Sequence, residues 1–380
     1  MKADVREART KTILIAAGGT GGHLFPAQAL AIELGKRGWR IELATDHRVS
    51  GYGQDFPAAE VHLIKSATPS GGGPVGKIGA AIKLALGTVM ATRLIRRVRP
   101  SAAIGFGGYP TVPPILAASW LGVPCLVHDA NAVLGRANKF LVPRVQAVAT
   151  SSAQVRVEVK PGTEVVETGN PVRPAVIEAS HTPYSLRGAA DPFRLLVFGG
   201  SQGARVFSEL VPPALEKLSP GTRARLQITQ QCREEDLAAV RAKYDALGLK
   251  AELAPFFRDL PARIAQSHLV ISRAGASTVS ELGVIGRPAI LVPLPGAIDQ
   301  DQRANAKAIA DVGGAFLIDQ KDLTPERLAK ELSNFIDRPE LLAEAARKAK
   351  SFGRPDAVQR LADLVEAVAA RGVNAKARQM

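Results

Sequence analysis

Two glycine-rich loops, about half a chain apart, constrain the fold more than any other feature of this sequence. The first reads GGTGGH over residues 18–23 and follows the apolar run 12–17; the second reads GGSQGA over residues 199–204 and follows the apolar run 195–198. A helical pattern of apolar residues follows each loop. A strand, a glycine loop and a helix open a βα unit with a parallel sheet, so the repetition predicts two similar α/β halves.

Further short apolar runs extend this alternation of strands and helices. We predict strands over residues 39–45, 102–106, 125–128 and 147–150 in the first half and over 226–229, 269–272 and 289–292 in the second. Between the halves, residues 168–174 contain two prolines and are typical of a linker. We therefore expect one domain over residues 1–168, a second over 169–354, and a C-terminal helical segment over 355–380 that packs back towards the first domain.

The charge of the chain is positive and unevenly placed. Its 380 residues include 49 Lys and Arg against 35 Asp and Glu, a formal net charge of +14. Half of this excess lies between Glu60 and Asp129, where no acidic residue occurs, and it comes from Lys65, Lys77, Lys83, Arg93, Arg96, Arg97 and Arg99. Such a patch can serve nucleic acid, anionic lipid or a phosphorylated substrate. Aromatic residues make up only 5%, which argues against single-stranded nucleic acid held by stacking.

The cysteines and the N-terminus indicate a reducing, cytoplasmic setting. Cys125 and Cys232 form neither a disulfide framework nor a metal-binding pair, and their apolar surroundings predict buried thiols. No apolar signal-peptide core follows the N-terminus.

Two segments have compositions that could bring them into contact with a membrane. Residues 101–127 carry no charge, but their four prolines exclude a spanning helix and favour a strand, a glycine loop and a short helix. Residues 77–99 form a basic helical pattern with an apolar stripe of Ile78, Ile82, Leu86 and Val89. That stripe either lies on anionic lipid or packs on the sheet, and the pattern leaves both open.

Several loops have the chemistry of anion and sugar sites. The loop ending at His23 can hold an anion at a helix start, where His23 is either a general base or a cap. Residues 273–278 (RAGAST) offer another such helix start, and Glu281 either accepts ribose hydroxyls or is a solvated helix residue. Residues 299–302 (DQDQ) with Asn305 suit sugar hydroxyls. The near match to an ATP-binding loop at 71–78 has Ile78 at the hydroxyl position, so we discard ATP binding.

Taken together, the motifs resemble glycosyltransferase family 28, which includes the UDP-N-acetylglucosamine transferases of peptidoglycan synthesis. The resemblance rests on GGTGGH at 18–23, GFGGYPT at 105–111, HDAN at 128–131, GNPVR at 169–173, GGSQGAR at 199–205, SRAGASTVSE at 272–281 and DQDQRANA at 299–306. It implies a GT-B fold, in which two Rossmann-like domains face each other across a cleft. The first domain would take the acceptor and the membrane, and the second would take UDP-N-acetylglucosamine.

The resemblance also implies roles for individual residues. On the donor these are Arg173 and Ser201 for UDP, Phe256 and Phe257 beside the uracil, Ala276, Ser277 and Thr278 for phosphate, Glu281 for the ribose, and Gln302, with Asp301 and Asn305, for the sugar. From the first domain, Thr20, Gly21, Gly22 and Asn131 would close on the donor, and His23 and Tyr109 would face the acceptor.

The implied reaction is inverting transfer to the C4 hydroxyl of undecaprenyl-diphospho-N-acetylmuramoyl-pentapeptide, with neither a metal nor another cofactor. His23 is the expected base and Asp129 the reserve. We expect a peripheral protein on the cytoplasmic face of the inner membrane and no nucleic-acid partner. The family commonly has HEQN where this chain has HDAN, and Asp301 replaces a His or Gln, so the roles at these positions are open. The alternatives are another GT-B enzyme, such as a glycolipid glucosyltransferase or a UDP-N-acetylglucosamine 2-epimerase, and a non-enzymatic basic module that binds RNA or membrane.

Overall fold

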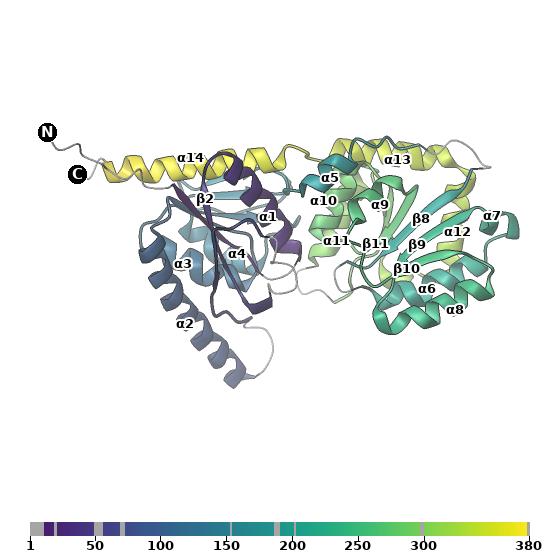
Figure 1. Ribbon diagram of the computed structural model, residues 1–380, viewed down its shortest axis with the longest axis horizontal. Helices are drawn as coiled ribbons and strands as arrows, with labels where there is room; N and C mark the ends of the chain where they lie inside the picture. The colour runs from purple at the N-terminus through teal and green to yellow at the C-terminus, as the bar shows by residue number, and fades with distance from the viewer. Residues whose placement is uncertain are drawn as a thin grey trace. The chain divides into compact units, whose positions relative to one another are not determined.

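The computed structural model divides the chain into two compact units (Figure 1). Unit 1 comprises Met1–Pro171 and Asp356–Met380, and unit 2 comprises Val172–Pro355. The structure describes residues 11–18, 21–48, 56–68, 73–152, 154–185, 191–200, 203–296 and 300–377. Each unit is built on one parallel sheet with helices on both faces, which confirms the predicted α/β class and its two similar halves.

Unit 1 contains a seven-stranded sheet of order β3-β2-β1-β4-β5-β6-β7, with every neighbouring pair parallel. The strands are β1 (Thr12–Ala16), β2 (Arg40–Thr45), β3 (Glu60–Leu63), β4 (Ala102–Gly105), β5 (Cys125–Asp129), β6 (Ala147–Thr150) and β7 (Glu164–Glu167). Alternate residues of β1 face opposite sides: Ile13 and Ile15 join one core cluster, and Leu14 and Ala16 join another. Because both faces are buried, the central strands consist of continuous apolar runs.

Helices cover both faces of this sheet. On the Ile13 face lie α1 (Gly21–Lys36) and α14 (Ala357–Ala377); on the Leu14 face lie α2 (Pro74–Val98), α3 (Val112–Trp120) and α4 (Arg136–Leu141). The C-terminal helix α14 packs along α1, as Figure 1 shows, and Arg37 of the turn after α1 contacts Asp363 at 2.6 Å and Glu366 at 2.8 Å. The chain from Asp356 onwards thus returns to the unit that holds the N-terminal half.

Unit 2 contains a six-stranded parallel sheet of order β10-β9-β8-β11-β12-β13. Its strands are β8 (Phe193–Phe198), β9 (Leu226–Gln231), β10 (Ala251–Ala254), β11 (Leu269–Ser272), β12 (Ala289–Leu291) and β13 (Phe316–Leu317). Its helices are α5 (Pro174–Ala179), α6 (Arg205–Glu216), α7 (Pro220–Ala224), α8 (Leu237–Ala246), α9 (Leu260–Gln266), α10 (Ala276–Ile285), α11 (Asp301–Asp311), α12 (Pro325–Asp337) and α13 (Pro339–Phe352). One core cluster lies beneath α6, α8 and α12, and the other beneath α5, α9, α10 and α11.

Two local expectations from the sequence are confirmed. Residues 101–127 fold as β4, the 3₁₀ turn Tyr109–Thr111 and α3, followed by β5. Cys125 and Cys232 are both buried and unbridged, and burial raises the pKa of the Cys125 thiol to about 12. A thiol with so high a pKa stays protonated and unreactive at neutral pH.

Candidate active site

His23 lies in the first turn of α1, directly after the first glycine loop and the end of β1. Its ring packs against the backbone of Gly107 and Gly108: a methyl group built on Gly107 would lie 3.4 Å from His23 Nε2, and one built on Gly108 would lie 3.4 Å from Cε1. Both glycines have positive φ, of 87° and 73°, so this approach requires glycine. The carboxyl end of the sheet, where parallel folds place ligands, therefore presents a half-buried imidazole.

The other residues predicted in this loop have different surroundings. Gly21 is buried against Phe25, whereas no atom lies within 4 Å of a methyl group built on Gly22. The side of the helix start at Gly22 is thus open to a ligand. Thr20 lies outside the described residues.

Asp129, the last residue of β5, is buried and organises the loop that follows it. Its Oδ1 accepts hydrogen bonds from Asn131 N at 3.1 Å and Asn131 Nδ2 at 3.5 Å, and its Oδ2 accepts from Gly135 N at 2.7 Å and Asn138 Nδ2 at 3.0 Å. Asn131 also accepts a bond from Ser151 Oγ through its carbonyl oxygen. A carboxylate that already accepts four bonds fixes the loop, and it has little capacity left for a substrate proton.

Asn138 of α4 is a site-building residue that sequence reasoning missed. Its amide donates to Asp129 Oδ2 and to the carbonyl oxygen of His128, both at 3.0 Å. His128 is fully buried, its Nε2 lies 3.0 Å from the Gly169 carbonyl oxygen, and burial lowers its pKa. A neutral His128 that donates to Gly169 ties β5 to the segment after β7. His128 therefore has a structural role. Of His128 and His23, only His23 is partly exposed.

In unit 2, the second glycine loop is held by a buried side chain that was also missed. Gln231 of β9 accepts a hydrogen bond from Gly199 N at 3.0 Å and donates to the carbonyl oxygens of Gly200 at 2.9 Å and Pro255 at 3.0 Å. One amide therefore positions both the glycine loop and the loop that carries Phe256. Ser201 lies outside the described residues.

The start of α10 has the arrangement of a phosphate site. Ala276, Ser277 and Thr278 form its first turn, and no side chain of the described residues caps it. The Ser277 hydroxyl is buried and has no hydrogen-bond partner among the described residues. The helix N-terminus supplies backbone N–H groups and a partial positive charge, both of which favour a phosphate group.

Arg173 and Glu281 form a pair beside this helix start. Arg173 Nη2 lies 3.1 Å from Glu281 Oε1, and Glu281 is 5% exposed. Burial raises the pKa of Glu281, and the charge and hydrogen bond of Arg173 oppose that rise. The structure therefore excludes a solvated helix residue at 281, one of the two interpretations that the sequence left open. The structure holds a buried carboxylate and a guanidinium together. The carboxylate can accept hydrogen bonds from hydroxyl groups, and the guanidinium can bind phosphate.

The polar residues around 300 are only partly available for a sugar. Gln302 Oε1 accepts a bond from Leu294 N at 3.0 Å, Asp301 Oδ1 caps the Gln302 N–H, and buried Asn305 donates to the Ala274 carbonyl oxygen at 3.2 Å. Asp301 thus caps the start of its own helix, Asn305 ties that helix to the segment after β11, and Gln302 is left with its amide N–H groups. Asp299 lies outside the described residues.

The two phenylalanines expected beside the uracil differ in exposure. Phe257 is 7% exposed, and the Arg263 guanidinium lies over its ring, 4.2 Å from the centroid. Phe256 is 49% exposed. The geometry therefore favours Phe256 over Phe257 as the ring that is able to stack on a base.

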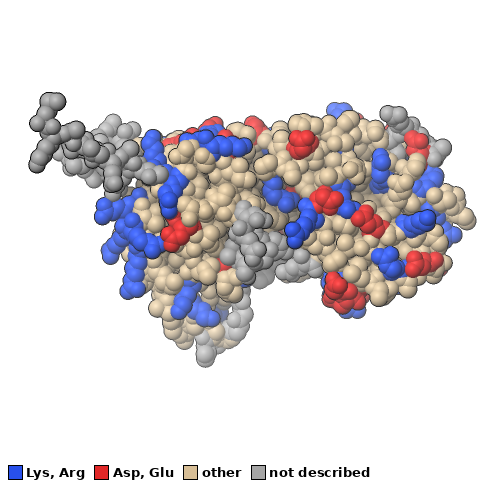
Figure 2. All heavy atoms as spheres, in the orientation of Figure 1, with Lys and Arg blue, Asp and Glu red and all other residues tan. Residues whose placement is uncertain are grey.

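The basic helix α2 presents its apolar stripe to solvent. Ile78 and Ile82 are 61% and 56% exposed, and Leu86 and Val89 are exposed too, while Leu94 and Ile95 pack into the core. The alternative that this stripe packs on the sheet is therefore wrong. All seven cations of the acid-free stretch are exposed, and Figure 2 shows Lys and Arg gathered on the side of unit 1 where α2 lies. Among the described residues, α2 alone is long and apolar enough to cross a membrane, by length and composition only.

Tyr109 lies beyond Gly108, at one end of a groove between α2, α3 and α4. Gly108, whose backbone packs against the His23 ring, directly precedes Tyr109 in the chain. The structure places His23, Tyr109, Asp129 and Asn131 on the loops at one end of the unit 1 sheet. Separately, it places Arg173, Glu281 and the start of α10 together in unit 2.

One cluster of metal-ligand type occurs among the described residues. Ligand atoms of Glu42, Glu60 and His62, on β2 and β3, lie within 4.8 Å of one another. Arg40 contacts Glu42 at 2.8 Å and Arg97 contacts Glu60 at 3.2 Å, so both carboxylates already have cationic partners. These arginines would repel a metal ion.

Comparisons with known proteins cover nearly the whole chain, and they show the GT-B fold that the resemblance implied. The family model for the glycosyltransferase family 28 N-terminal domain matches residues 13–150, and the model for the family 28 C-terminal domain matches residues 194–361. A relative from Nitrobacter winogradskyi is 55% identical over 95% of this chain and 98% of its own length. It is named UDP-N-acetylglucosamine–N-acetylmuramyl-(pentapeptide) pyrophosphoryl-undecaprenol N-acetylglucosamine transferase. A relative of the same name from Methylobacterium radiotolerans is 56% identical over 95% of this chain and 99% of its own. Among solved structures, Acinetobacter baumannii MurG is 32% identical, with a TM-score of 0.76, over 94% of this chain and 99% of its own.

Proposed function

We propose, from the premise that this chain belongs to glycosyltransferase family 28, that it transfers N-acetylglucosamine from UDP-N-acetylglucosamine to undecaprenyl-diphospho-muramoyl-pentapeptide. The observation that carries the proposal is the near full-length similarity to relatives that bear this activity in their names. The arrangement of residues in each unit supports specific roles, which are argued in turn below.

The donor binds to unit 2 in this proposal. The first turn of α10 receives the diphosphate through the N–H groups of Ala276, Ser277 and Thr278, and the unpartnered Ser277 hydroxyl adds a donor. Glu281 accepts hydrogen bonds from the ribose hydroxyls, and Arg173 pairs with that carboxylate and opposes the rise in its pKa that burial causes. As the bond from the sugar to UDP breaks, negative charge grows on the diphosphate, and the helix start stabilises that charge.

The acceptor binds to unit 1, and His23 removes the proton from its C4 hydroxyl. The imidazole is half-buried at the end of the sheet and held against the Gly107–Gly108 backbone. Asp129, the reserve candidate, acts instead as a positioning residue because its two oxygens already accept bonds from the loop 131–138. The hydroxyl oxygen attacks the anomeric carbon from the face opposite UDP, so the product has the inverted β-1,4 configuration.

The surface of α2 binds the cytoplasmic face of the membrane in this proposal. Exposed Ile78 and Ile82 supply apolar area, and the surrounding Lys and Arg supply attraction to anionic headgroups. With no acidic residue between Glu60 and Asp129, nothing in this stretch of sequence opposes that attraction. The protein thereby meets a lipid-linked acceptor where that acceptor resides.

The transfer itself is tested with labelled UDP-N-acetylglucosamine and a muramoyl-diphospholipid. We expect a labelled lipid product, and little product from UDP-N-acetylgalactosamine as the control donor. Release of an isomerised UDP-sugar without any acceptor would identify the epimerase alternative, and absence of UDP binding would favour the non-enzymatic module.

The base is tested by His23→Ala, which should lower kcat by about 10²–10⁴-fold. Asp129→Asn serves as the comparison. It should lower activity because it loosens the loop 131–138, but it should keep the fall in rate at low pH that His23→Ala removes. A loss of less than tenfold in a folded His23→Ala protein would contradict the assignment.

The membrane surface is tested by neutralising Arg93, Arg96 and Arg97 to Gln together. Binding to anionic vesicles should weaken while UDP affinity stays unchanged. The matched control is Arg241, Lys243 and Lys250 to Gln, which removes the same charge from exposed positions of unit 2. Equal vesicle binding by both triple variants would overturn the membrane role of α2.

A further inference from the structure

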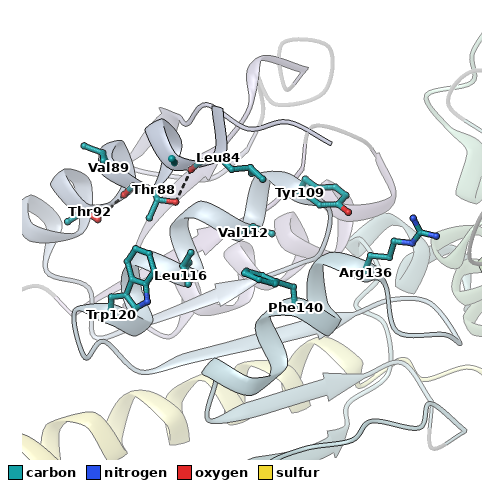
Figure 3. A pocket seen from close by; sticks show the side chains of 11 residues that line it. Leu84, Thr88, Val89, Thr92, Tyr109, Val112, Leu116, Trp120, Arg136 and Phe140 are labelled. Atoms are coloured by element: carbon teal, nitrogen blue, oxygen red, sulfur yellow. Dashed lines mark hydrogen bonds between the residues drawn. The ribbon is translucent and has the colours of Figure 1, made fainter. Parts of the chain in front are cut away.

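A groove of about 670 Å³ crosses the surface of unit 1 between α2, α3 and α4 (Figure 3). Its walls come from Leu84 and Val89 of α2, Val112 and Leu116 of α3, and Phe140 of α4. This volume lies within the range of small-molecule sites. The groove belongs wholly to unit 1, so its shape depends only on how these three helices pack on one sheet.

The polar atoms along the middle of the groove are satisfied internally. Thr88 Oγ1 donates to the Leu84 carbonyl oxygen and Thr92 Oγ1 to the Thr88 carbonyl oxygen, both at 2.8 Å, as Figure 3 shows. Because each hydroxyl bonds back to its own helix, the two threonines present methyl groups to the groove. The floor therefore offers hydrocarbon contact and nothing for a polar ligand.

The two ends of the groove differ in chemistry. In Figure 3 the Tyr109 hydroxyl and the Arg136 guanidinium lie at one end, and Trp120 lies at the other. Trp120 is 67% exposed, as expected of a ring at a membrane surface. The groove thus runs from a polar, cationic end to an aromatic, exposed end.

The polar end leads directly to the proposed acceptor site. Tyr109 follows Gly108, whose Cα adjoins the His23 ring, and Arg136 opens α4, whose Asn138 holds Asp129. A ligand with a sugar at His23 and a diphosphate near Arg136 would therefore carry any attached hydrocarbon into the groove.

We propose that this groove binds the first isoprene units of the acceptor's polyprenyl chain, so that the protein recognises the lipid as well as the sugar. This inference rests on the proposed function, which supplies a polyprenyl diphosphate as acceptor. A polyprenyl diphosphate fits the groove in three respects: it has an anionic group for the Arg136 end, an apolar chain for the methyl-lined floor, and a continuation that can leave towards the membrane at Trp120. The rest of the chain stays in the bilayer.

The experiment separates the groove from the membrane by removing the membrane. Muramoyl-pentapeptide diphosphates with one, two, three or four isoprene units are assayed without detergent or vesicles, below their micelle-forming concentrations. Each methylene buried in a groove is worth about fourfold in affinity. We expect kcat/KM to rise at least tenfold from one to four units.

The groove itself is tested by Ala85→Trp, which fills it from an exposed position of α2 without removing a core side chain. The matched control is Ala81→Trp, the same substitution one turn earlier at an exposed position that does not line the groove. Ala85→Trp should abolish the dependence on chain length, while the KM for the donor stays as in the wild type. Ala81→Trp should keep the dependence.

Several results would overturn the inference while leaving the transferase activity in place. These are equal kcat/KM for all chain lengths in the wild type, or the same rise in Ala85→Trp as in Ala81→Trp. A third is loss of the chain-length effect when monomeric short-chain phosphatidylglycerol is added, because it would assign the groove to a phospholipid acyl chain. Failure of the proposed function is distinct, since no acceptor of any length would then receive sugar.

Discussion

The pair of Arg173 and Glu281 allows a quantitative test of the donor site. The Glu281 side chain is 7% exposed and the Arg173 side chain 25%, with 3.1 Å between Nη2 and Oε1. Removing one partner of a fully buried pair costs about 3–5 kcal/mol, and because Arg173 is a quarter exposed we expect about 2–3 kcal/mol for Arg173→Met. For a domain of this size, that loss lowers the melting temperature by roughly 5–10 °C.

The same pair makes the loss depend on pH. Burial raises the folded-state pKa of Glu281 above its ordinary value of 4.5, and Arg173 limits that rise. A carboxyl whose pKa is raised on folding stabilises the fold below its unfolded pKa, and that stability is lost as pH rises through the folded pKa. Without Arg173 the pKa of Glu281 rises further, so Arg173→Met should lose more stability at pH 8 than at pH 5.

Thermal unfolding of four proteins at both pH values completes the test: wild type, Arg173→Met, Glu281→Gln and the double variant. The double variant should be more stable than Arg173→Met at pH 8, because Gln carries no charge to leave unpaired. Additive losses in the double variant, or an Arg173→Met deficit that is the same at pH 5 and pH 8, would refute the reasoning.

Two further predictions concern the loops. Gly107→Ala forces a non-glycine residue to a φ of 87° and puts a methyl group 3.4 Å from His23, so we expect about 1–2 kcal/mol less stability and at least tenfold lower kcat, with an unchanged donor KM in steady-state kinetics. Gln231→Leu leaves the backbone groups of Gly199, Gly200 and Pro255 unpaired, so we expect the protein to be about 1–3 kcal/mol less stable. We also expect the donor KM, measured by steady-state kinetics, to rise at least tenfold. A donor KM unchanged in Gln231→Leu would show that the glycine loop holds its shape without that amide.

The sequence predicted every interior strand of both sheets and none of their edges. The nine predicted strands correspond to β1, β2, β4, β5 and β6 in unit 1 and to β8, β9, β11 and β12 in unit 2. The four missed strands, β3, β7, β10 and β13, are the outermost strands of the two sheets. Interior strands such as β1 (TILIA) and β11 (LVIS) are buried and mostly apolar, whereas β3 (EVHL) and β7 (EVVE) begin or end with charged residues and are partly exposed. Periodicity therefore detects burial more than it detects strands.

The candidate site divides in the same way between local and distant signals. The glycine loops and the start of α10 are local strand–loop–helix patterns, and they were found. Gln231 and Asn138 are single polar residues inside a strand and a helix, and their importance comes from partners 24 to 32 and 9 to 10 residues away. Neither the spacing nor the type of these residues distinguishes them before the fold brings the loops together.

The two interpretations of α2 show why composition alone could not settle its role. The helix carries apolar side chains on two sides: Leu94 and Ile95 pack into the core, and Ile78 and Ile82 are exposed to solvent. A helix with apolar residues outside its core-facing side is normally covered by protein or by lipid, and only a third of the apolar segment of α2 is buried in unit 1. This exposed apolar area is bordered by cations and by the groove that ends at Trp120. Its contact with water costs free energy, and contact with lipid removes that cost. The positive charge therefore acts together with an apolar surface, and this combination favours anionic lipid over nucleic acid as the partner of the basic stretch.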